Sequence, residues 1–501
     1  MRILSNIVLV LSVALLLVPS SFASTFYIDS ASGNDANDGS SPQHALKSLD
    51  AVNAKTFGPG DRLLFKAGSK FSGQLKPQGS GKLIDEKPQV ITIDMYGQGL
   101  KPRIDGEGQA LDALLLRNVE YWDVANLEIT NHGEQRAAGR TGVRVVSDGA
   151  GIMHGIHLHD LFVHDVNGEL TKQREGCGIF FESRGANPSS FDGLLIDNCH
   201  VVQTDRNGIC QRTAGRAHST HVVIRNNLLE DIGGDGIKIW GSNGALVEHN
   251  IIRGGRMRAQ DAAAGIWPFD SDDTVIQFND VGGMKGTNDG QGFDSDYRCH
   301  RTLIQYNYSH DNDGGFILIC APGTSFCEGT IVRYNISQHD GIKAARVFHI
   351  SGNVTNTSIY NNTIYVAEDQ DLPLLLFTDW SRGNPDTTRF YNNIFYADGK
   401  ARFTWGKSTN NVFENNVFFG NLVSPPDDPA RITEKPPLMR PGKGTDLASL
   451  DAYRPTVEGK MPRGKIVADN GGRDFFGMPL PKDQPPCVGA AEGTVARAAR
   501  P

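Results

Sequence analysis

Hydrophobic positions fall in short runs along the chain, and one run recurs with a polar residue at its end. The unit is an apolar residue followed three positions later by Asn, or once by Cys, and it ends at Cys199, Asn227, Asn250, Asn279, Asn307, Asn335, Asn362, Asn393 and Asn416. These positions are 23 to 31 residues apart. That period fits one coil of a solenoid, in which each short strand pairs with its counterpart one coil away. Copies of a turn Asn, a residue that tolerates left-handed backbone geometry, can hydrogen-bond along the stack. The pattern predicts coils over residues 111–420.

A second recurring segment begins with Gly and continues with alternating residues. Because side chains alternate between the two faces of a strand, the apolar residue after each Gly points inward and its neighbours point outward. Aligning the segments on Gly178, Gly208, Gly236, Gly265, Gly292 and Gly315 gives two outward columns. The first contains Phe180, Cys210, Lys238, Trp267, Asp294 and Ile317. The second contains Glu182, Arg212, Trp240, Phe269, Asp296 and Ile319.

The segments on either side of the coils have other patterns. Residues 24–110 hold short strands broken by Gly and Pro, which predicts an N-terminal cap and the first coils. A short helix is expected to begin near Pro42 and to cover one end of the solenoid, with one face formed by Ala45, Leu46, Leu49 and Val52. Residues 421–501 are rich in Pro and show no new apolar period, so we expect an irregular segment that packs on the last coils.

Together these features resemble the right-handed parallel β-helix, or pectate-lyase-like, superfamily. The segments Phe26–Asp29 and Asp474–Gly477 also resemble the two ends of secreted members. The resemblance covers roughly residues 24–493 and implies an all-β fold, a right-handed parallel β-helix with a short N-terminal capping helix. It leaves the activity open, because this architecture hosts polysaccharide lyases, glycoside hydrolases, esterases and adhesins.

The N-terminus predicts export. Residues 1–23 combine Arg2, an apolar run from Ile7 to Val18 and a small residue at Ala23, which is typical of a signal peptide. We therefore expect a secreted or periplasmic protein, and later segments contain no candidate membrane span. The formal net charge of −8 disfavours nucleic acid as a partner. The expected partner is a polysaccharide or oligosaccharide substrate, and the expected state is a monomer.

Seven cysteines in an oxidising compartment permit disulfides but leave at least one thiol unpaired within the monomer. Cys320 and Cys327 flank a loop with Pro322 and Gly323, so they are the expected pair. The sequence has no Cys-x-x-Cys motif, which disfavours a zinc site built on thiolates.

Charged and aromatic residues converge on the outward columns near Gly292. A single charge on a solenoid coil usually only faces solvent, but large aromatic side chains on an outward face should be covered by a loop or a ligand. Flat aromatic surfaces suit sugar rings, and flanking charges suit their hydroxyls. We therefore predict a carbohydrate site whose substrate-binding residues are Trp240, Trp267, Phe269 and Glu182.

Two mechanisms fit this set of residues, and the first is β-elimination at a uronate sugar. The resemblance implies that Lys or Arg acts as the base and that calcium is held by Asp or Glu. Lys238 would be the base, with its pKa lowered by the nearby Arg212 and by burial. Calcium would be held by Asp270, Asp294 and Asp296. An excess of basic residues near this face favours an acidic substrate, so a polysaccharide lyase is the leading hypothesis.

The alternatives keep the same face but change the chemistry. A glycoside hydrolase would use Asp294 with Asp296, or Asp270 with Asp294, and the sequence does not fix the separation that distinguishes retaining from inverting enzymes. His310, at a predicted turn, is a further candidate acid or base. A non-catalytic carbohydrate-binding or adhesin solenoid would need the aromatic residues but not the constellation of Lys238 with the aspartates.

Overall fold

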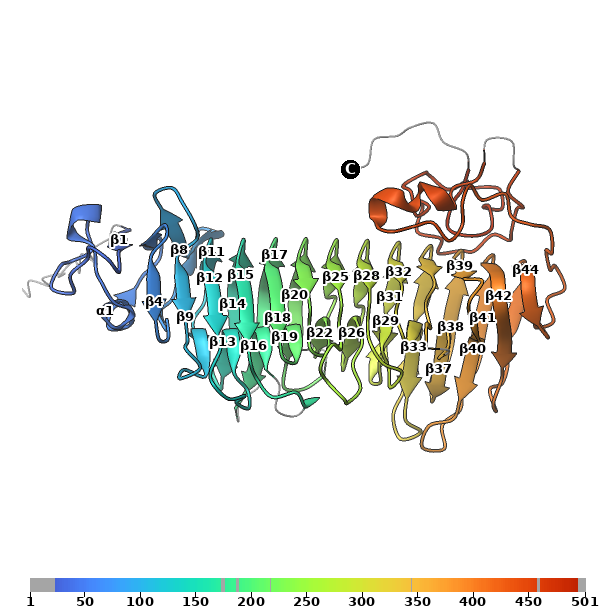
Figure 1. The fold of residues 1–501 in the computed structure, drawn as a ribbon, viewed down its shortest axis with the longest axis horizontal. Helices are drawn as coiled ribbons and strands as arrows, with labels where there is room; N and C mark the ends of the chain where they lie inside the picture. Colours follow the sequence, from blue (N-terminus) through green and yellow to red (C-terminus); the bar gives the residue numbers. More distant parts are fainter. Residues whose placement is uncertain are drawn as a thin grey trace, which may run out of the picture.

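The computed structural model describes residues 23–493, except for 173–175, 186–188, 217, 344 and 457–459. The predicted signal peptide, residues 1–23, lies outside this part apart from Ala23. The described chain forms one long stack of coils, with a last, irregular segment folded back along its side (Figure 1). In this part of the chain, no helix has the length and apolar character needed to span a bilayer.

Three ladders of parallel strands run along the stack, and a few short strands lie outside them. The first ladder is a 17-stranded sheet of β1 (Thr25–Ile28), β3 (Arg62–Lys66), β8 (Ile91–Tyr96), β11 (Trp122–Ala125), β14 (Ile152–His159), β17 (Ser190–Asp197), β20 (Ser219–Arg225), β23 (Ser242–Asn243), β24 (Leu246–Glu248), β27 (Val275–Gln277), β30 (Cys299–His300), β31 (Leu303–Gln305), β34 (Cys327–Glu328), β35 (Ile331–Arg333), β38 (Val354–Tyr360), β41 (Asp386–Tyr391) and β43 (Val412–Glu414).

The second and third ladders are joined through the long strand β42 into one 23-stranded sheet. The second ladder consists of β4 (Lys70–Ser72), β9 (Arg103–Asp105), β12 (Glu128–Asn131), β15 (Phe162–Val166), β18 (His200–Thr204), β21 (Leu228–Glu230), β25 (Ile251–Arg253), β28 (Asp280–Gly282), β32 (Tyr308–His310), β36 (Ile336–Gln338), β39 (Thr363–Val366), β42 (Ile394–Thr404) and β44 (Val417–Val423). The third consists of β10 (Asp112–Arg117), β13 (Thr141–Asp148), β16 (Cys177–Arg184), β19 (Asn207–Arg212), β22 (Ile237–Trp240), β26 (Ile266–Phe269), β29 (Gln291–Ser295), β33 (Gly315–Ala321), β37 (Phe348–Gly352) and β40 (Asp371–Thr378).

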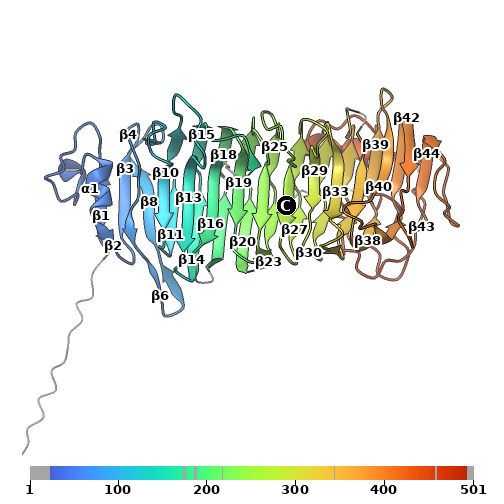
Figure 2. The same ribbon diagram turned by 90° about the horizontal axis from the view of Figure 1, so that it is seen from below.

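The short elements outside the ladders lie toward the N-terminus. Strand β2 (Thr56–Phe57) pairs with β5 (Gln78–Gly79), and β6 (Lys82–Ile84) forms an antiparallel hairpin with β7 (Lys87–Gln89), visible as the projection in Figure 2. The expected capping helix is split into a 3₁₀ turn, η1 (Pro42–His44), and a short helix, α1 (Leu49–Asn53). Ser48 caps α1 at its N-terminus, and Leu49 and Val52 are buried in the core of the solenoid.

Apolar side chains from all three ladders fill the inside of every coil. In one coil, Ile224 of β20, Leu229 of β21 and Ile237 of β22 are each 0% exposed. Because the same positions are apolar in the next coil, the core continues along the stack as one buried cluster. Each coil thus buries its apolar side chains against its neighbours.

The predicted Asn column is confirmed, and it lies at the corner between the first and second ladders. Each side-chain amide donates to the Oδ1 atom of the Asn in the next coil, over 2.9–3.1 Å from Asn227 to Asn416. The same Oδ1 atoms accept the backbone N–H groups of the preceding Asn residues, so the corner is fully hydrogen-bonded. At the C-terminal end, Asp428 accepts from Asn416 and closes the ladder.

The left-handed residue at this corner is not the stacked Asn but the residue before it. Its φ lies between 50° and 61° at Asn198, Asn226, His249, Phe278, Tyr306, Tyr334, Asn361, Asn392 and Asn415. The preceding residue makes the turn, which leaves the Asn side chain directed into the buried stack. The expected turn geometry is therefore displaced by one position.

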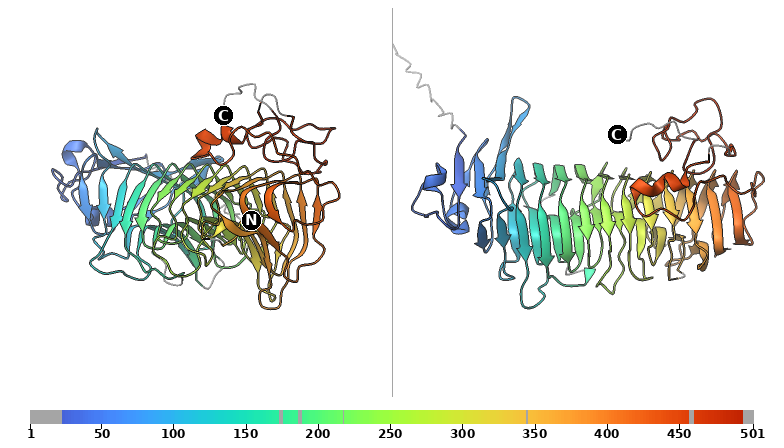
Figure 3. Two further views of the ribbon diagram at one scale, coloured as in Figure 1. Left: turned by 45° about the vertical axis from the view of Figure 1, so that its right-hand side comes forward. Right: turned by 45° about the horizontal axis from the view of Figure 1, so that its top comes forward.

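The segment after β44 packs on the outside of the C-terminal half of the stack (Figure 3). Among its described residues, the regular element is a 3₁₀ helix, η3 (Leu447–Tyr453), whose buried Leu450 and Tyr453 lie in a cluster with Tyr308 and Ile336 of the second ladder. This segment lies against the second ladder, and the outward face of the third ladder carries the candidate site described below.

Replacing Asn307 by Ala should destabilise the fold strongly. The side chain of Asn307 donates to the Ile276 carbonyl and to Asn335 and accepts twice from Asn279, so its loss leaves several buried groups without partners. We expect the free energy of unfolding to fall by about 3–6 kcal/mol, measured by chemical denaturation. Asn356→Gly, at an exposed position of β38 with positive φ, is the matched control and should change stability by less than about 1 kcal/mol. Equal effects of the two substitutions would contradict the assignment of stability to the ladder.

Candidate active site

The outward face of the third ladder brings the predicted columns together over four consecutive strands, β19 to β29. Lys238 of β22 lies directly opposite Trp267 of β26, and Trp240 lies opposite Phe269. The register Ile266 to Phe293 then places Asp294 next to Trp267 in the first column. The strands are adjacent in the centre of the stack (Figure 1). The predicted register is correct over this part of the ladder.

The register prediction is wrong by one residue at the next strand, β33. Asp294 pairs with Leu318 and Ser295 with Ile319, so Leu318 and Cys320 continue the outward columns. The predicted members, Ile317 and Ile319, point into the core and are fully buried. The alignment failed because Gly315 pairs with Gln291, the residue before Gly292.

A cavity of about 300 Å³ opens on this face. It is lined by Lys172, Arg212, Lys238, Trp240, Trp267, Phe269, Asp296 and Tyr297. Most of the predicted site residues therefore meet around one space. Lys172 and Tyr297 were not predicted as site residues: Lys172 precedes β16 in a segment without periodic pattern, and Tyr297 lies two residues beyond the end of β29.

Aromatic rings form one wall of the cavity. Phe269 packs edge to face against Trp240, with 4.8 Å between ring centroids, and against Tyr297 at 4.6 Å. The guanidinium of Arg212 lies 5.2 Å from the centre of the Trp240 ring. Such a wall combines flat apolar surfaces with charged groups at its edge, as carbohydrate sites do.

Trp267 is fixed more firmly than the other rings. It is 5% exposed, its indole N–H donates to Asp235 over 3.0 Å, and the ammonium of Lys172 lies 4.7 Å from its ring centre. Burial opposes ionisation of Asp235, but the nearby charge of Arg206, 3.1 Å away, holds its pKa below the ordinary value. We expected a loop or a ligand to cover the aromatic face, and the side chain of Lys172 provides part of that cover.

Asp294 and Asp296 form a close pair of carboxyl groups. Oxygen atoms of the two side chains lie within 4.8 Å of each other and of the Cys320 thiol. Burial raises the pKa of Asp294 well above its ordinary value, and the negative charges of Asp296 and Asp289 raise it further. Burial also raises the pKa of Asp296, to about 6. Two charges on this pair are therefore disfavoured, and Asp294 holds its proton more strongly than Asp296 does.

The two carboxyl groups have different surroundings. Asp296 lines the cavity, accepts from the backbone N–H of Tyr297 over 2.7 Å and accepts from Cys320 over 3.3 Å. Asp294 is 3% exposed, and its Oδ1 atom has no hydrogen-bond partner in the described part of the chain. The carboxyl group that ionises more readily thus faces the cavity, and the one that holds its proton more strongly is almost fully buried.

Further polar groups around the pair were not predicted. Burial raises the pKa of Asp289 and lowers that of His349 to about 3, so both are neutral more readily than in water. Gln291, at the start of β29, is fully buried and neither polar atom of its side chain has a partner among the described residues. His349 was missed because β37 does not begin with Gly, although register places it in the column of Asp294 and Leu318.

The expected disulfide between Cys320 and Cys327 is absent, and all seven cysteines are free and buried. Cys320 faces outward beside Asp296, whereas Cys327 faces the core and lies 3.4 Å from the hydroxyl of Ser295. Cys320 lies on β33 of the third ladder with its thiol directed outward, and Cys327 lies on β34 of the first ladder with its thiol in the core, so the two thiols do not face each other. The disulfide was predicted from proximity in sequence alone, without regard to the side of its strand on which each cysteine lies.

The predicted calcium ligands are not brought together as a set. Asp270 makes an ion pair with Arg298. It also accepts a hydrogen bond of 3.3 Å from the indole N–H of Trp240. The group that lies with Asp294 and Asp296 is instead the thiol of Cys320. Calcium takes six to eight oxygen ligands, so two carboxyls of raised pKa and a thiol do not fit it.

Glu182 and His310 also lie apart from the cavity. Glu182 is in the second column, but it accepts from Arg144 over 3.0 Å and is not part of the cavity wall. His310 lies in β32 of the second ladder, between Asp280 at 3.1 Å and Asp311 at 2.7 Å. Burial disfavours the charged imidazole, but hydrogen bonds to both carboxylates outweigh it and raise the pKa of His310 to about 9. His310 is thus a buried ion-pair residue instead of a rim acid or base.

His310 should make stability depend on pH in the alkaline range. Its pKa is about 9 when folded and about 6.5 when unfolded, so its contribution is complete below pH 6.5 and is lost as pH rises through 9. The difference amounts to roughly 3 kcal/mol. We expect His310→Gln to remove this dependence from denaturation curves recorded between pH 6 and pH 10, while activity at a fixed pH is unchanged. An unaltered pH profile in the variant would refute the role assigned to His310.

Comparisons with known proteins support the predicted fold but favour a different reaction class from the one predicted. A family model described as a right handed beta helix region matches residues 177–364, and the predicted right-handed parallel β-helix is confirmed. A lacto-N-biosidase of Bifidobacterium longum subsp. longum is 29% identical in an alignment that covers 95% of this chain and 37% of that protein. The chain therefore spans little more than a third of the length of that relative.

Two solved structures are also similar to this chain. The native crystal structure of a GH136 lacto-N-biosidase from Eubacterium ramulus is 27% identical, with a TM-score of 0.59, over 78% of this chain and 67% of that chain. A complex of XylC with xylose has a TM-score of 0.52 at 11% identity, over 93% of this chain and 98% of that chain, and it shows similarity of fold alone.

The leading hypothesis from the sequence, a polysaccharide lyase acting by β-elimination, is therefore wrong. The proteins most informative about chemistry here are glycoside hydrolases, which matches the alternative built on paired carboxylates. The sequence argument for a lyase rested on Lys238 and on the excess of basic residues. Lys238 does line the cavity, but it lies 5.7 and 5.8 Å from the ring centres of Trp240 and Trp267, in an aromatic setting.

Proposed function

We propose that this chain is a glycoside hydrolase that cleaves an oligosaccharide in the cavity above β22, β26 and β29, with Asp296 as the carboxylate nucleophile. The observation that carries the proposal is the pair of Asp294 and Asp296, two close carboxyl groups of raised pKa beside an aromatic wall. The similarity to lacto-N-biosidases supports the reaction class.

The separation of the carboxyl groups favours a retaining mechanism. Retaining enzymes place the two groups about 5–5.5 Å apart, whereas inverting enzymes leave about 6.5–9.5 Å for a water molecule. Oxygens of Asp294 and Asp296 within 4.8 Å suit the shorter class. Asp296 would attack the anomeric carbon while a neutral carboxylic acid protonates the leaving oxygen. Water would then attack the glycosyl ester, giving its proton to the same acid residue.

Two residues can supply that acid, and Asp294 is the first candidate. Burial raises its pKa well above the ordinary value and it lies close to Asp296, but it is almost fully buried. Asp289 also has a raised pKa, and its charge acts on both Asp294 and Asp296. Substitution of each residue, as described below, distinguishes them.

The remaining cavity residues would bind and orient the sugar. Trp240, Phe269 and Tyr297 offer ring faces and edges for its apolar surfaces, and Arg212 and Lys172 offer donors for its hydroxyl groups. The volume of about 300 Å³ is at the small end for ligand sites, which suits a short terminal unit better than a long chain. An oligosaccharide ending in lacto-N-biose is the first substrate to test, because the similar proteins are named for that unit.

Asp296→Asn should lower kcat/KM for a cleaved glycoside by at least about a thousandfold, because the variant lacks the attacking carboxylate. An activated aryl leaving group should not restore it, since the missing step is bond formation at the anomeric carbon. Asp273→Asn is the matched control: Asp273 is half-exposed, pairs with Arg301 and should keep full activity. An Asp296→Asn variant with more than a tenth of the parent activity would overturn the assignment.

Asp294→Asn and Asp289→Asn identify the acid. The variant that lacks the acid should lose activity on the natural glycoside but recover most of it on an aryl glycoside whose leaving group needs no proton. We expect this pattern for Asp294→Asn and a uniform loss for Asp289→Asn. The reverse would assign the acid to Asp289 and leave the nucleophile unchanged.

The pH profile of kcat/KM should reflect the raised pKa values. Since the pKa of Asp296 is about 6 and the nucleophile must be ionised, activity should rise as pH increases through 6. It should fall again only where the acid of raised pKa loses its proton, which gives a bell-shaped profile. A rising limb near pH 4, the ordinary range of an Asp, would contradict the burial of the pair.

A further inference from the structure

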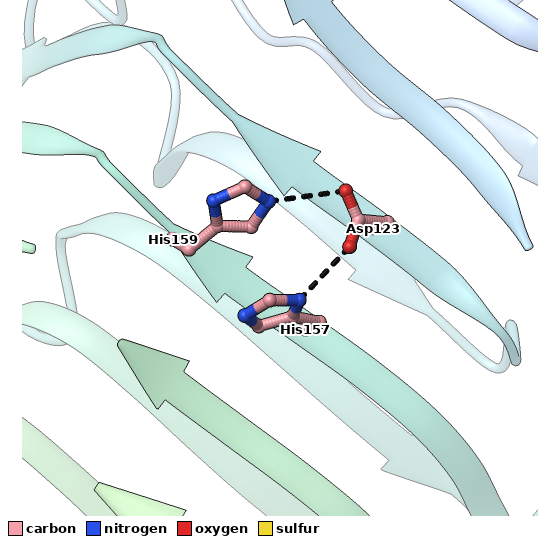
Figure 4. Close-up of side chains that lie close together, drawn as sticks. All are labelled: Asp123, His157 and His159. Carbon is pink, nitrogen blue, oxygen red and sulfur yellow. Dashed lines mark hydrogen bonds and ion pairs between the residues drawn. The ribbon is translucent and has the colours of Figure 1, made fainter. Parts of the chain in front are cut away.

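A second cluster of polar side chains lies on the outward face of the first ladder, away from the cavity on the third ladder. It consists of Asp123 on β11 and of His157 and His159 on the neighbouring strand β14 (Figure 4). Register places Asp123 directly opposite His157, and His159 is two residues further along the same face. The three side chains are between 25% and 31% exposed, so solvent reaches the cluster.

Both imidazoles point at one carboxylate. The Nδ1 atom of His157 lies 2.9 Å from one oxygen of Asp123, and the Nε2 atom of His159 lies 3.1 Å from the other oxygen. All three ligand atoms lie within 4.8 Å of one another. In a tetrahedral zinc site with bonds of about 2.0–2.2 Å, ligand atoms are about 3.4 Å apart. The two distances between a histidine nitrogen and a carboxylate oxygen of Asp123 would need to widen by only a few tenths of an ångström to admit such an ion.

His159 is oriented by a second carboxylate. Its Nδ1 atom lies 2.6 Å from an oxygen of Asp160. If Nδ1–H donates to Asp160, a neutral His159 presents the lone pair of Nε2 to an oxygen of Asp123, which repels it. A cation is therefore needed between Nε2 and Asp123, either a proton or a metal ion. Metal-bound histidines commonly have this arrangement, with the far ring nitrogen donating to a carboxylate.

We propose that Asp123, His157 and His159 form a binding site for a divalent transition-metal ion of the zinc type. Two imidazole nitrogens and one carboxylate oxygen are ligands that such ions prefer, and the partial exposure leaves room for water in the remaining position. The ion would take the place of the hydrogen bonds that link the imidazoles to the carboxylate. The site does not depend on the proposed hydrolase activity.

The position of the site suggests what the ion would do. Asp123 and the two histidines belong to adjacent coils near the N-terminal end of the stack (Figure 2). A bound ion would join these coils across the strand pair β11–β14, in addition to the backbone hydrogen bonds. Since the unfolded chain does not hold the ligands together, binding should stabilise the folded N-terminal coils.

The test uses the full chain without added histidine tag, freed of metal by a chelator and titrated with ZnCl₂ in a calorimeter. We expect one tight site per chain, and a rise in Tm on addition of the ion. Asp123→Asn and His159→Gln should each weaken binding at least about a hundredfold, and Asp160→Asn about tenfold, because it only orients His159. Visible absorption of the Co²⁺-loaded protein gives an independent report of the same ligand set.

The matched control is His154→Gln. His154 lies on the same strand, is similarly exposed and pairs with one carboxylate, Glu120, but has no second histidine beside it. It should leave Zn²⁺ affinity unchanged. The proposal is refuted if the parent binds no Zn²⁺ more tightly than Asp123→Asn does, or if His154→Gln weakens binding as much as His159→Gln, which would indicate adventitious binding to surface histidines. Circular dichroism of each variant checks that the fold is retained.

Discussion

The stacking of identical corners is the constraint on which the rest of the structure depends. The buried Asn ladder fixes which residue of each coil lies above which residue of the next, because each side-chain amide bonds to its counterpart in the next coil. A slip of one residue would turn every outward side chain of a strand into the core. The alignment of Lys238 with Trp267, and of Trp267 with Asp294, is therefore a consequence of hydrogen bonds at a distant corner.

Several buried polar groups on and beside the third ladder lack hydrogen-bond partners. Gln291, Asp294, Arg346 and His349 each have at least one buried polar atom without a partner among the described residues. Burying such groups lowers the stability of the fold, and proteins tolerate this at functional sites. The shift of the pKa values of Asp294 and Asp296 has the same origin, since burial removes the water that would stabilise both charges. The stability of the coils permits a destabilised site on their surface.

The sequence predicted the fold well because a repeated pattern carries many copies of one signal. The Asn column, the coil period and the face of Lys238 to Asp296 all follow from periodicity. Periodicity could not place residues outside the repeat, such as Lys172, which comes from a segment without a period. Aligning the strands on Gly also put β33 one residue out of register, because Gly315 pairs with Gln291 and not with Gly292. His310 and Asp270 were predicted as site residues from type and proximity alone, and their ion pairs with Asp280 and Arg298 show why that was insufficient. The His-x-His of β14 was visible in the sequence, but its partner Asp123 lies a coil away.

The chemistry was the least predictable part, because the same face suits a base for elimination and a carboxylate pair for hydrolysis. What decides between them is the protonation of Asp294 and Asp296, which depends on burial. The most direct test is to trap the intermediate with a fluorinated glycoside that forms the glycosyl ester quickly and releases it slowly, followed by mass spectrometry of the intact protein and its peptides. We expect one sugar per chain, attached to the peptide that contains Asp296 and located on that side chain. Attachment to another residue, or complete turnover of a normal substrate without any trapped ester, would contradict it.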